Sequence, residues 1–108
     1  MVTTDEVIAR AVSLGCELGT HYRDPAVFYQ ERHILSPDRV PGAFFVRLDW
    51  EDHDAWLAEH SDVVYKIPHF DTWPYLLVRQ DALTLEQLHL LLDQSIRVAA
   101  KPIKRRKL

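Results

Sequence analysis

His69, Trp73 and Tyr75 are the residues of this sequence whose types and spacing best suit a binding site. Tryptophan and tyrosine rings can stack on a base or on another planar molecule, and a histidine beside them can contact a phosphate. With Phe28 and Tyr29 they form our candidate site for a small aromatic ligand. The opposing interpretation is structural, because aromatic side chains serve cores more often than ligands. Trp73 would then close the end of a sheet, and His69 would cap a turn.

Basic residues form a second candidate set, for the phosphate backbone of double-stranded DNA. Phosphate contacts need cations along one surface. The predicted DNA-binding residues are Arg32, Lys66, His69, Arg79, Lys101, Lys104, Arg105, Arg106 and Lys107, and the same track could include His33, Arg39 and Arg47. Acidic residues close to them in the sequence favour the alternative of a mixed, solvent-facing surface. These acidic residues are Glu31, Asp38, Asp49 and Asp71.

Charge is distributed unevenly along the chain. Residues 1–62 carry a formal charge of −7 and residues 63–108 carry +4, although the last eight residues alone, KPIKRRKL, carry +5. An acidic front and a basic rear can orient a protein on a polyanion. The plainer interpretation is a solvated tail that keeps the protein soluble, and the overall charge of −3 argues against DNA binding.

Metal binding and catalysis find little support in the sequence. His53 and His60 lie seven residues apart on a predicted helix, hence on one face, but nothing in the sequence supplies the further ligands that a metal site needs. The chain has no GxSxG, HExxH or phosphate-cradling glycine motif. Cys16 has no evident histidine partner and reads as a buried apolar residue. We therefore expect no metal, no cofactor and no enzymatic activity.

The composition is that of one soluble globular domain. A chain of 108 residues with 47% hydrophobic residues can bury a real core. The single cysteine excludes an internal disulfide and fits a reducing compartment. No apolar run reaches membrane-spanning length, and the N-terminus does not look like a signal peptide. We expect a cytoplasmic protein with no membrane partner.

Periodicity and chain breakers predict the order of elements. The predicted segments are a helix over 3–14, a connection over 16–25, a strand over 26–35, a loop over 36–42, a strand over 43–50, a helix over 51–60, a strand–loop–strand hairpin over 63–80 and a helix over 84–98. Capping-box spacing marks the starts of the first and last helices, at Thr3 and Thr84. This order predicts an α+β fold in which the N- and C-terminal helices pack on one face of an antiparallel sheet. Residues 1–100 form the domain, and residues 101–108 form a basic tail that frays.

An aromatic loop with a histidine and a Trp–Pro pair, then a strand, then a leucine-rich helix follow one another over about residues 65–100. The matching positions are Pro68–Phe70, Trp73–Pro74, Leu76–Arg79, Leu85–Leu88 and Leu91–Arg97. In this order the sequence resembles the MmcQ/YjbR family. The resemblance implies a CyaY-like (frataxin-like) α/β sandwich with a double wing, and a DNA-binding role. The chain departs from the family at Ile96, where a tryptophan is frequent.

Three functional hypotheses follow. The leading one is a non-enzymatic binding protein of the MmcQ/YjbR type that contacts DNA through its wings and basic tail. The alternative is a sequestration- or resistance-type protein that holds a small aromatic ligand, or a protein partner, and has no nucleic-acid role. The third is an assembly role with dimer contacts through Cys16 and a sheet edge, so the chain would be a monomer or a homodimer.

Overall fold

Six antiparallel strands and three α-helices make up the chain in a computed structural model, which describes residues 1–107 except the side chains of residues 38 and 39. The strand order across the sheet is β1-β2-β3-β4-β6-β5. In chain order the elements are α1 (Thr4–Ser13), β1 (Glu17–His21), β2 (Asp24–Tyr29), β3 (Arg32–Val40), β4 (Ala43–Arg47), α2 (Trp50–Glu59), β5 (Val64–Tyr65), the 3-10 helix η1 (Pro68–Phe70), β6 (Tyr75–Arg79) and α3 (Leu85–Val98).

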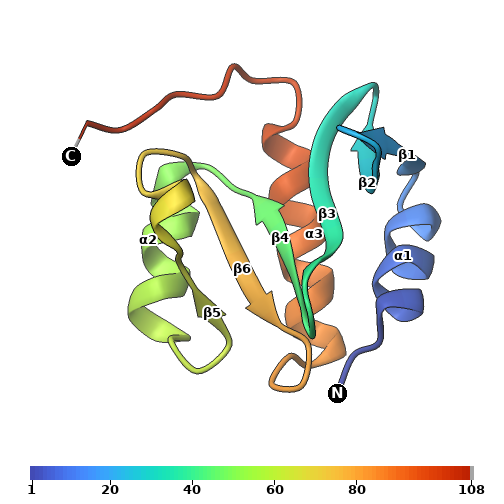
Figure 1. Cartoon of the computed structure of the whole chain (residues 1–108), viewed down its shortest axis with the longest axis horizontal. Helices are drawn as coiled ribbons and strands as arrows, with labels where there is room; N and C mark the ends of the chain where they lie inside the picture. Colours follow the sequence, from blue (N-terminus) through green and yellow to red (C-terminus); the bar gives the residue numbers. More distant parts are fainter. Residues whose placement is uncertain (108) are drawn as a thin grey trace.

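Helices α1 and α3 contact each other and cover one face of the sheet, where α1 lies against β3 and α3 lies against β4 (Figure 1). Between the helices and the sheet lies the main core. Its helical part comes from Val7 and Ala11 of α1 and from Leu88, Leu91 and Leu92 of α3, and its sheet part includes Ile34, Phe44, Val46 and Leu76. The predicted α+β class, with both terminal helices on one face of an antiparallel sheet, is confirmed.

The predicted capping boxes are present at both terminal helices. Thr3 accepts a hydrogen bond from the backbone of Glu6, whose side chain accepts one from the backbone of Thr3. Thr84 and Gln87 repeat this exchange at α3. Each box satisfies backbone donors that a helix start would otherwise leave without partners. The sequence therefore fixes where both helices begin.

The N-terminal half departs from the prediction. Residues 16–25, predicted as a connection, form β1 and the start of β2, and residues 26–35, predicted as one strand, contain the turn between β2 and β3. Both hairpins turn on two residues with positive φ, Tyr22–Arg23 at 52° and 73° and Gln30–Glu31 at 48° and 68°. Two-residue turns of this kind usually carry Asn or Gly. Because these positions carry large side chains instead, the sequence did not indicate either turn.

Strand β3 also ends later in the chain than predicted. The loop predicted over 36–42 is the second half of β3 followed by the turn Pro41–Gly42, where Gly42 has a φ of 76°. The β3–β4 register shifts between Ser36 and Val40, and such irregularities are where a strand tolerates a proline. Pro37 was therefore compatible with a strand.

The strand–loop–strand prediction for 63–80 is confirmed, with a shorter first strand. Strand β5 has only two residues and pairs antiparallel with β6. Pro68 begins η1 and Pro74 immediately precedes β6, so neither proline lies inside a strand, where its missing backbone donor would interrupt the pairing. Within the described residues, no helix is long and apolar enough to cross a membrane.

The basic tail does not fray as expected. After α3 the chain runs across one end of the molecule (Figure 1). The Trp50 indole donates to the Lys104 carbonyl at 2.7 Å, and the Arg106 amide donates to the Thr72 carbonyl at 2.8 Å. These contacts join residues far apart in sequence and hold the tail against the domain.

Candidate ligand-binding site

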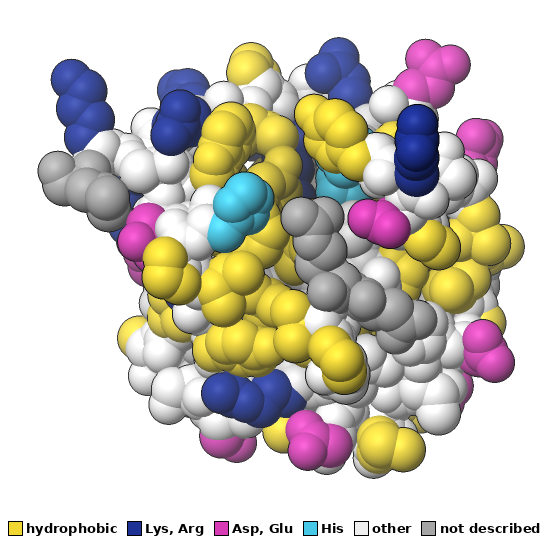
Figure 2. Space-filling model, in the orientation of Figure 1, with side chains coloured by type: hydrophobic (Ala, Val, Ile, Leu, Met, Phe, Trp, Pro, Cys, Tyr) yellow, Lys and Arg dark blue, Asp and Glu magenta, His cyan; other side chains and the backbone are white. Residues whose placement is uncertain are grey.

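Aromatic side chains cover the sheet face that α1 and α3 leave open. A second apolar cluster lies there, formed by Ala43, Phe45, Phe70 and Leu77 with Trp73 and Tyr75 packed against it. Beside it lies a pocket of about 330 Å³ that we call the aromatic basin. Its lining residues are His21, Tyr22, His33, Phe45, His69, Phe70, Trp73 and Tyr75. Figure 2 shows hydrophobic side chains gathered on this face, with histidine among them.

The rings of the basin contact one another in a continuous layer. His21 stacks on His33 at a centroid distance of 4.4 Å, and His33 meets Phe45 edge-on at 5.6 Å. Phe45 contacts Tyr75 at 5.5 Å, and Trp73 lies nearly parallel to Tyr75 at 6.3 Å. Because each ring is held by its neighbours, the basin presents flat apolar surface that needs little reordering when a ligand binds.

An irregularity in β3 explains why His33 belongs to this layer. The β2–β3 register pairs Val27 with Leu35 and then Phe28 with His33, which leaves Ile34 as an extra residue. Ile34 and Leu35 are both fully buried in the main core. The extra residue changes the alternation of side chains along the strand, as β-bulges do, and His33 lies on the open face.

The structure brings together three of the five residues predicted to bind an aromatic ligand. His69, Trp73 and Tyr75 line the basin. Phe28 touches its edge through a ring contact with His33 at 5.6 Å, whereas Tyr29 packs against the main core instead. Five lining residues were not predicted as members of this site: His21, Tyr22, His33, Phe45 and Phe70. Strand pairing brings His21, His33 and Phe45 next to the predicted residues, so the sequence carried no local signal for them.

A second, smaller pocket adjoins the basin and shares His21, His33 and Tyr75 with it. We call it the cationic pocket; its volume is about 280 Å³. The remaining lining residues are Arg32, Arg47, Lys101, Pro102 and Ile103. The lining therefore combines two arginines and a lysine with no carboxylate among its described members.

Arg47 is the most deeply buried charge in this pocket, with 4% of its surface exposed. Its guanidinium donates to the carbonyl of Ala99 at 3.1 Å and to the carbonyl of Lys101. Its Nε is buried without a hydrogen-bond partner, and none of the ion pairs among the described residues includes Arg47. Burial lowers the pKa of Arg47; Tyr75 opposes this shift, and the nearby charge of Arg32 adds to it.

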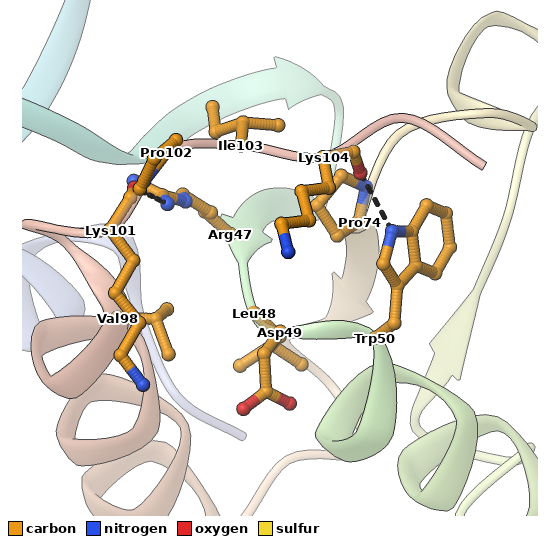
Figure 3. Close-up of a pocket in the computed structure, with 10 residues that line it drawn as sticks. All are labelled: Arg47, Leu48, Asp49, Trp50, Pro74, Val98, Lys101, Pro102, Ile103 and Lys104. Carbon is orange, nitrogen blue, oxygen red and sulfur yellow. Dashed lines mark hydrogen bonds between the residues drawn. The ribbon is translucent and has the colours of Figure 1, made fainter.

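A third cavity, of about 380 Å³, lies on the other side of the tail (Figure 3). Tail residues 102–104 run along its upper side in this view, and Leu48 and Asp49 lie along its lower side. Arg47 and residues 101–103 line both this cavity and the cationic pocket. The first residues of the tail therefore form the wall between the two.

The tail arginines stack on tryptophans. The Arg106 guanidinium lies 4.0 Å from the Trp50 ring centroid and binds both carboxylate oxygens of Asp54, at 3.1 and 2.9 Å. Arg105 lies 4.7 Å from the Trp73 ring and donates to the Thr72 hydroxyl at 3.0 Å. Both arginines of the tail, which were predicted to bind DNA, therefore have partners within the chain.

Lys66 is held in a half-buried network. Its Nζ donates to the Trp73 carbonyl at 2.7 Å and lies 2.7 Å from His53 Nε2. His53 Nδ1 lies 2.9 Å from Asp54, so a neutral ring with its proton on Nδ1 satisfies both contacts. Burial lowers the pKa of Lys66 to about 8 and also lowers the pKa of His53. The predicted DNA-binding Lys66 therefore serves a contact inside the protein.

This network predicts a pH-dependent stability. The folded-state pKa of Lys66 is lowered from 10.5 to about 8, so the unfolded chain binds more protons between these values. Stability should therefore rise with pH across this window. The full shift corresponds to about 3 kcal/mol, and partial exposure reduces the expected gain to about 1–2 kcal/mol.

The measurement is urea unfolding of wild type and Lys66→Met from pH 7.5 to 10.5. The difference in unfolding free energy between them should change by this amount in favour of wild type as the pH rises. Lys107→Met, which removes an exposed lysine, controls for the loss of one charge. A difference between wild type and Lys66→Met that stays constant with pH would contradict the burial of the ammonium group.

The other predicted DNA-binding residues do not form one track. Arg32 and Lys101 line the cationic pocket, and Lys104 lines the cavity under the tail. Arg79 lies at the opposite end of β6 from Tyr75 and stacks on Tyr65 at 4.3 Å. Lys107 is exposed, and the side chain of residue 39 lies outside the described part of the chain.

The histidines considered for a metal site have other contacts. The buried His53 belongs to the lysine network, and the ring of His60 packs against Trp56 at 4.7 Å. Among the described residues, no group of three or more His, Cys, Asp or Glu could hold a metal ion. Cys16 is buried, as predicted for an apolar role, and burial raises the pKa of its thiol. Because its side chain is buried, Cys16 cannot contact a second copy of the chain in this structure.

No protein-family model matches the chain, and searches of curated proteins and of solved structures find no match either.

Proposed function

We propose that this chain is a non-enzymatic binding protein whose aromatic basin holds a small planar ligand. The observation that carries this proposal is the pre-formed layer of rings on the open face of the sheet. A pocket of about 330 Å³ falls in the range of small-molecule sites, which are mostly apolar with a few polar groups. His69 is exposed at the basin, and Trp73 and Tyr75 are half-buried, so ring surface remains open for stacking.

Removal of the Trp73 ring should weaken binding of a planar probe. We expect Trp73→Ala to bind 2-naphthamide about tenfold more weakly than wild type, because stacking on one aromatic side chain contributes about 1–3 kcal/mol. Isothermal titration calorimetry measures the affinity. Leu90→Ala, which truncates an exposed residue of α3 outside the basin, should bind as wild type does. Equal affinity of Trp73→Ala and wild type would refute the basin as the site.

Because Arg105 of the tail stacks on Trp73, loss of this ring could also disturb the tail, and a second variant tests the basin without touching that contact. Tyr22 lines the basin but is 85% exposed and has a φ of 52°. Tyr22→Asn removes the ring and keeps a residue that tolerates this backbone conformation. A several-fold loss of 2-naphthamide affinity in this variant supports the same site from its opposite rim.

DNA binding stays a prediction, and so does membership of the MmcQ/YjbR family with its CyaY-like sandwich. The order β5, η1, β6 and α3 supports the family resemblance. Arg32 and Lys101 line the adjoining cationic pocket and His69 lines the basin, and this arrangement supports a nucleic-acid role. Against that role, Arg105 and Arg106 would have to leave their tryptophan partners. Absence of binding to a labelled DNA duplex at about 50 mM salt would exclude it, because phosphate contacts are strongest at low salt.

A further inference from the structure

The cationic pocket is the feature that the proposed function leaves unexplained. Arg32, Arg47 and Lys101 line a volume of about 280 Å³, and no acidic side chain is among the described residues that line it. Lys101 meets Arg47 through its carbonyl oxygen, and its side chain runs down the view away from Arg47 (Figure 3). Arg32 lies near enough for its charge to lower the pKa of Arg47, and two such like charges repel each other unless an anion lies between them. The local sequence offers Glu31 beside Arg32, yet Glu31 is not part of this lining.

Arg47 provides the second, independent observation. A guanidinium is costly to bury unless its charge and its five N–H donors find partners. Two backbone carbonyls accept from Arg47, but its Nε has no partner and no described carboxylate pairs with the group. The pocket therefore holds a buried positive charge without a counter-ion.

The basin and the cationic pocket are continuous through His21, His33 and Tyr75. From this arrangement we infer that the site selects planar aromatic molecules carrying an oxyanion, a carboxylate or a phosphate. The ring stacks in the basin and the oxyanion lies in the cationic pocket beside Arg32 and Arg47. This inference rests on the proposed function, since the ring must occupy the basin for the oxyanion to reach the cations.

The polar contacts decide the selectivity. Arginine and lysine bind oxyanions through charge-assisted hydrogen bonds, which are about twice as strong as neutral ones. A neutral amide of the same shape would leave the arginines without a counter-charge. One charge-assisted hydrogen bond corresponds to roughly a tenfold or greater difference in affinity. We therefore expect 2-naphthoate to bind at least about tenfold more tightly than 2-naphthamide.

The test compares 2-naphthoate, 2-naphthyl phosphate and 2-naphthamide by isothermal titration calorimetry. Arg32→Gln is the principal variant, because Arg32 is exposed and its loss spares the core. It should reduce 2-naphthoate affinity about tenfold and leave 2-naphthamide affinity unchanged. Arg79→Gln removes an arginine at the other end of β6 and should change neither affinity.

Each outcome bears on a defined claim. Selective loss of 2-naphthoate binding in Arg32→Gln supports the inference, and the ratio of carboxylate to phosphate affinity tells which oxyanion the pocket prefers. Equal wild-type affinities for 2-naphthoate and 2-naphthamide would overturn the inference while leaving the proposed function intact. Failure of all three probes to bind would overturn both.

Discussion

Replacing Phe45 with alanine should lower the free energy of unfolding by about 3–5 kcal/mol, the usual loss for a buried phenylalanine. Phe45 is 4% exposed and lies in the apolar cluster of the open face. Its ring contacts those of His33, Phe70 and Tyr75 at 5.6, 5.1 and 5.5 Å. Alanine would leave a cavity beneath the basin and remove the contacts that hold these rings.

Thermal and urea unfolding followed by circular dichroism measure this effect. A loss of this size should lower the melting temperature by more than about 10 °C in a chain of this length. Phe28→Ala serves as the matched control, because Phe28 is half-buried at the edge of the same face and should cost less. A loss below about 1 kcal/mol for Phe45→Ala would mean that the open face is not packed as described.

Deletion of residues 101–108 should also destabilise the protein, by about 2–4 kcal/mol. The deletion removes two arginine–tryptophan contacts, each contributing about 0.5–2 kcal/mol, together with the ion pair between Arg106 and Asp54. Arg47 loses the Lys101 carbonyl as an acceptor, and the Trp50 indole loses the carbonyl of Lys104. The emission of Trp50 should shift to longer wavelength because water reaches the ring.

A chain that ends at Arg106 is the matched control for this deletion. It lacks only the last two residues and keeps the contacts of Arg105 and Arg106. We expect its unfolding free energy and its tryptophan emission to match those of the full chain. If the deletion of residues 101–108 also leaves both quantities unchanged, the tail does not pack against the domain in solution.

The sequence predicted the fold class because its strongest signals are local. The capping boxes at Thr3 and Thr84 and the leucines of α3 each lie within one element. The sequence did not predict the two N-terminal hairpins, because their turns lack the usual Asn or Gly residues. Gly19 and Pro25 are also more typical of a connection than of a strand. Both residues lie in the β1–β2 hairpin, where Thr20 pairs with Pro25, and the β2–β3 pairing begins only at Val27, beyond this proline.

The site was predictable only where its members are neighbours in sequence. His69, Trp73 and Tyr75 belong to one loop and its following strand, so their clustering was visible. His33 lies in the basin because of an irregularity in the β2–β3 pairing, which the hydrophobic pattern of the sequence does not predict. The tail contacts join residues more than 30 positions apart, and Trp50 and Lys104 are 54 apart, so sequence periodicity carried no signal for them.

The central claim is that a planar molecule binds in the aromatic basin, and the three tryptophans allow a direct test. Trp73 lines the basin, Trp50 lies under the tail, and Trp56 is buried in the main core. The measurement is a titration of the ¹⁵N-labelled protein with 2-naphthoate, following the three indole N–H signals. We predict a saturable shift of the Trp73 signal with little change at Trp56. A Trp73 signal that stays fixed, or shifts only together with the other two, would contradict the account.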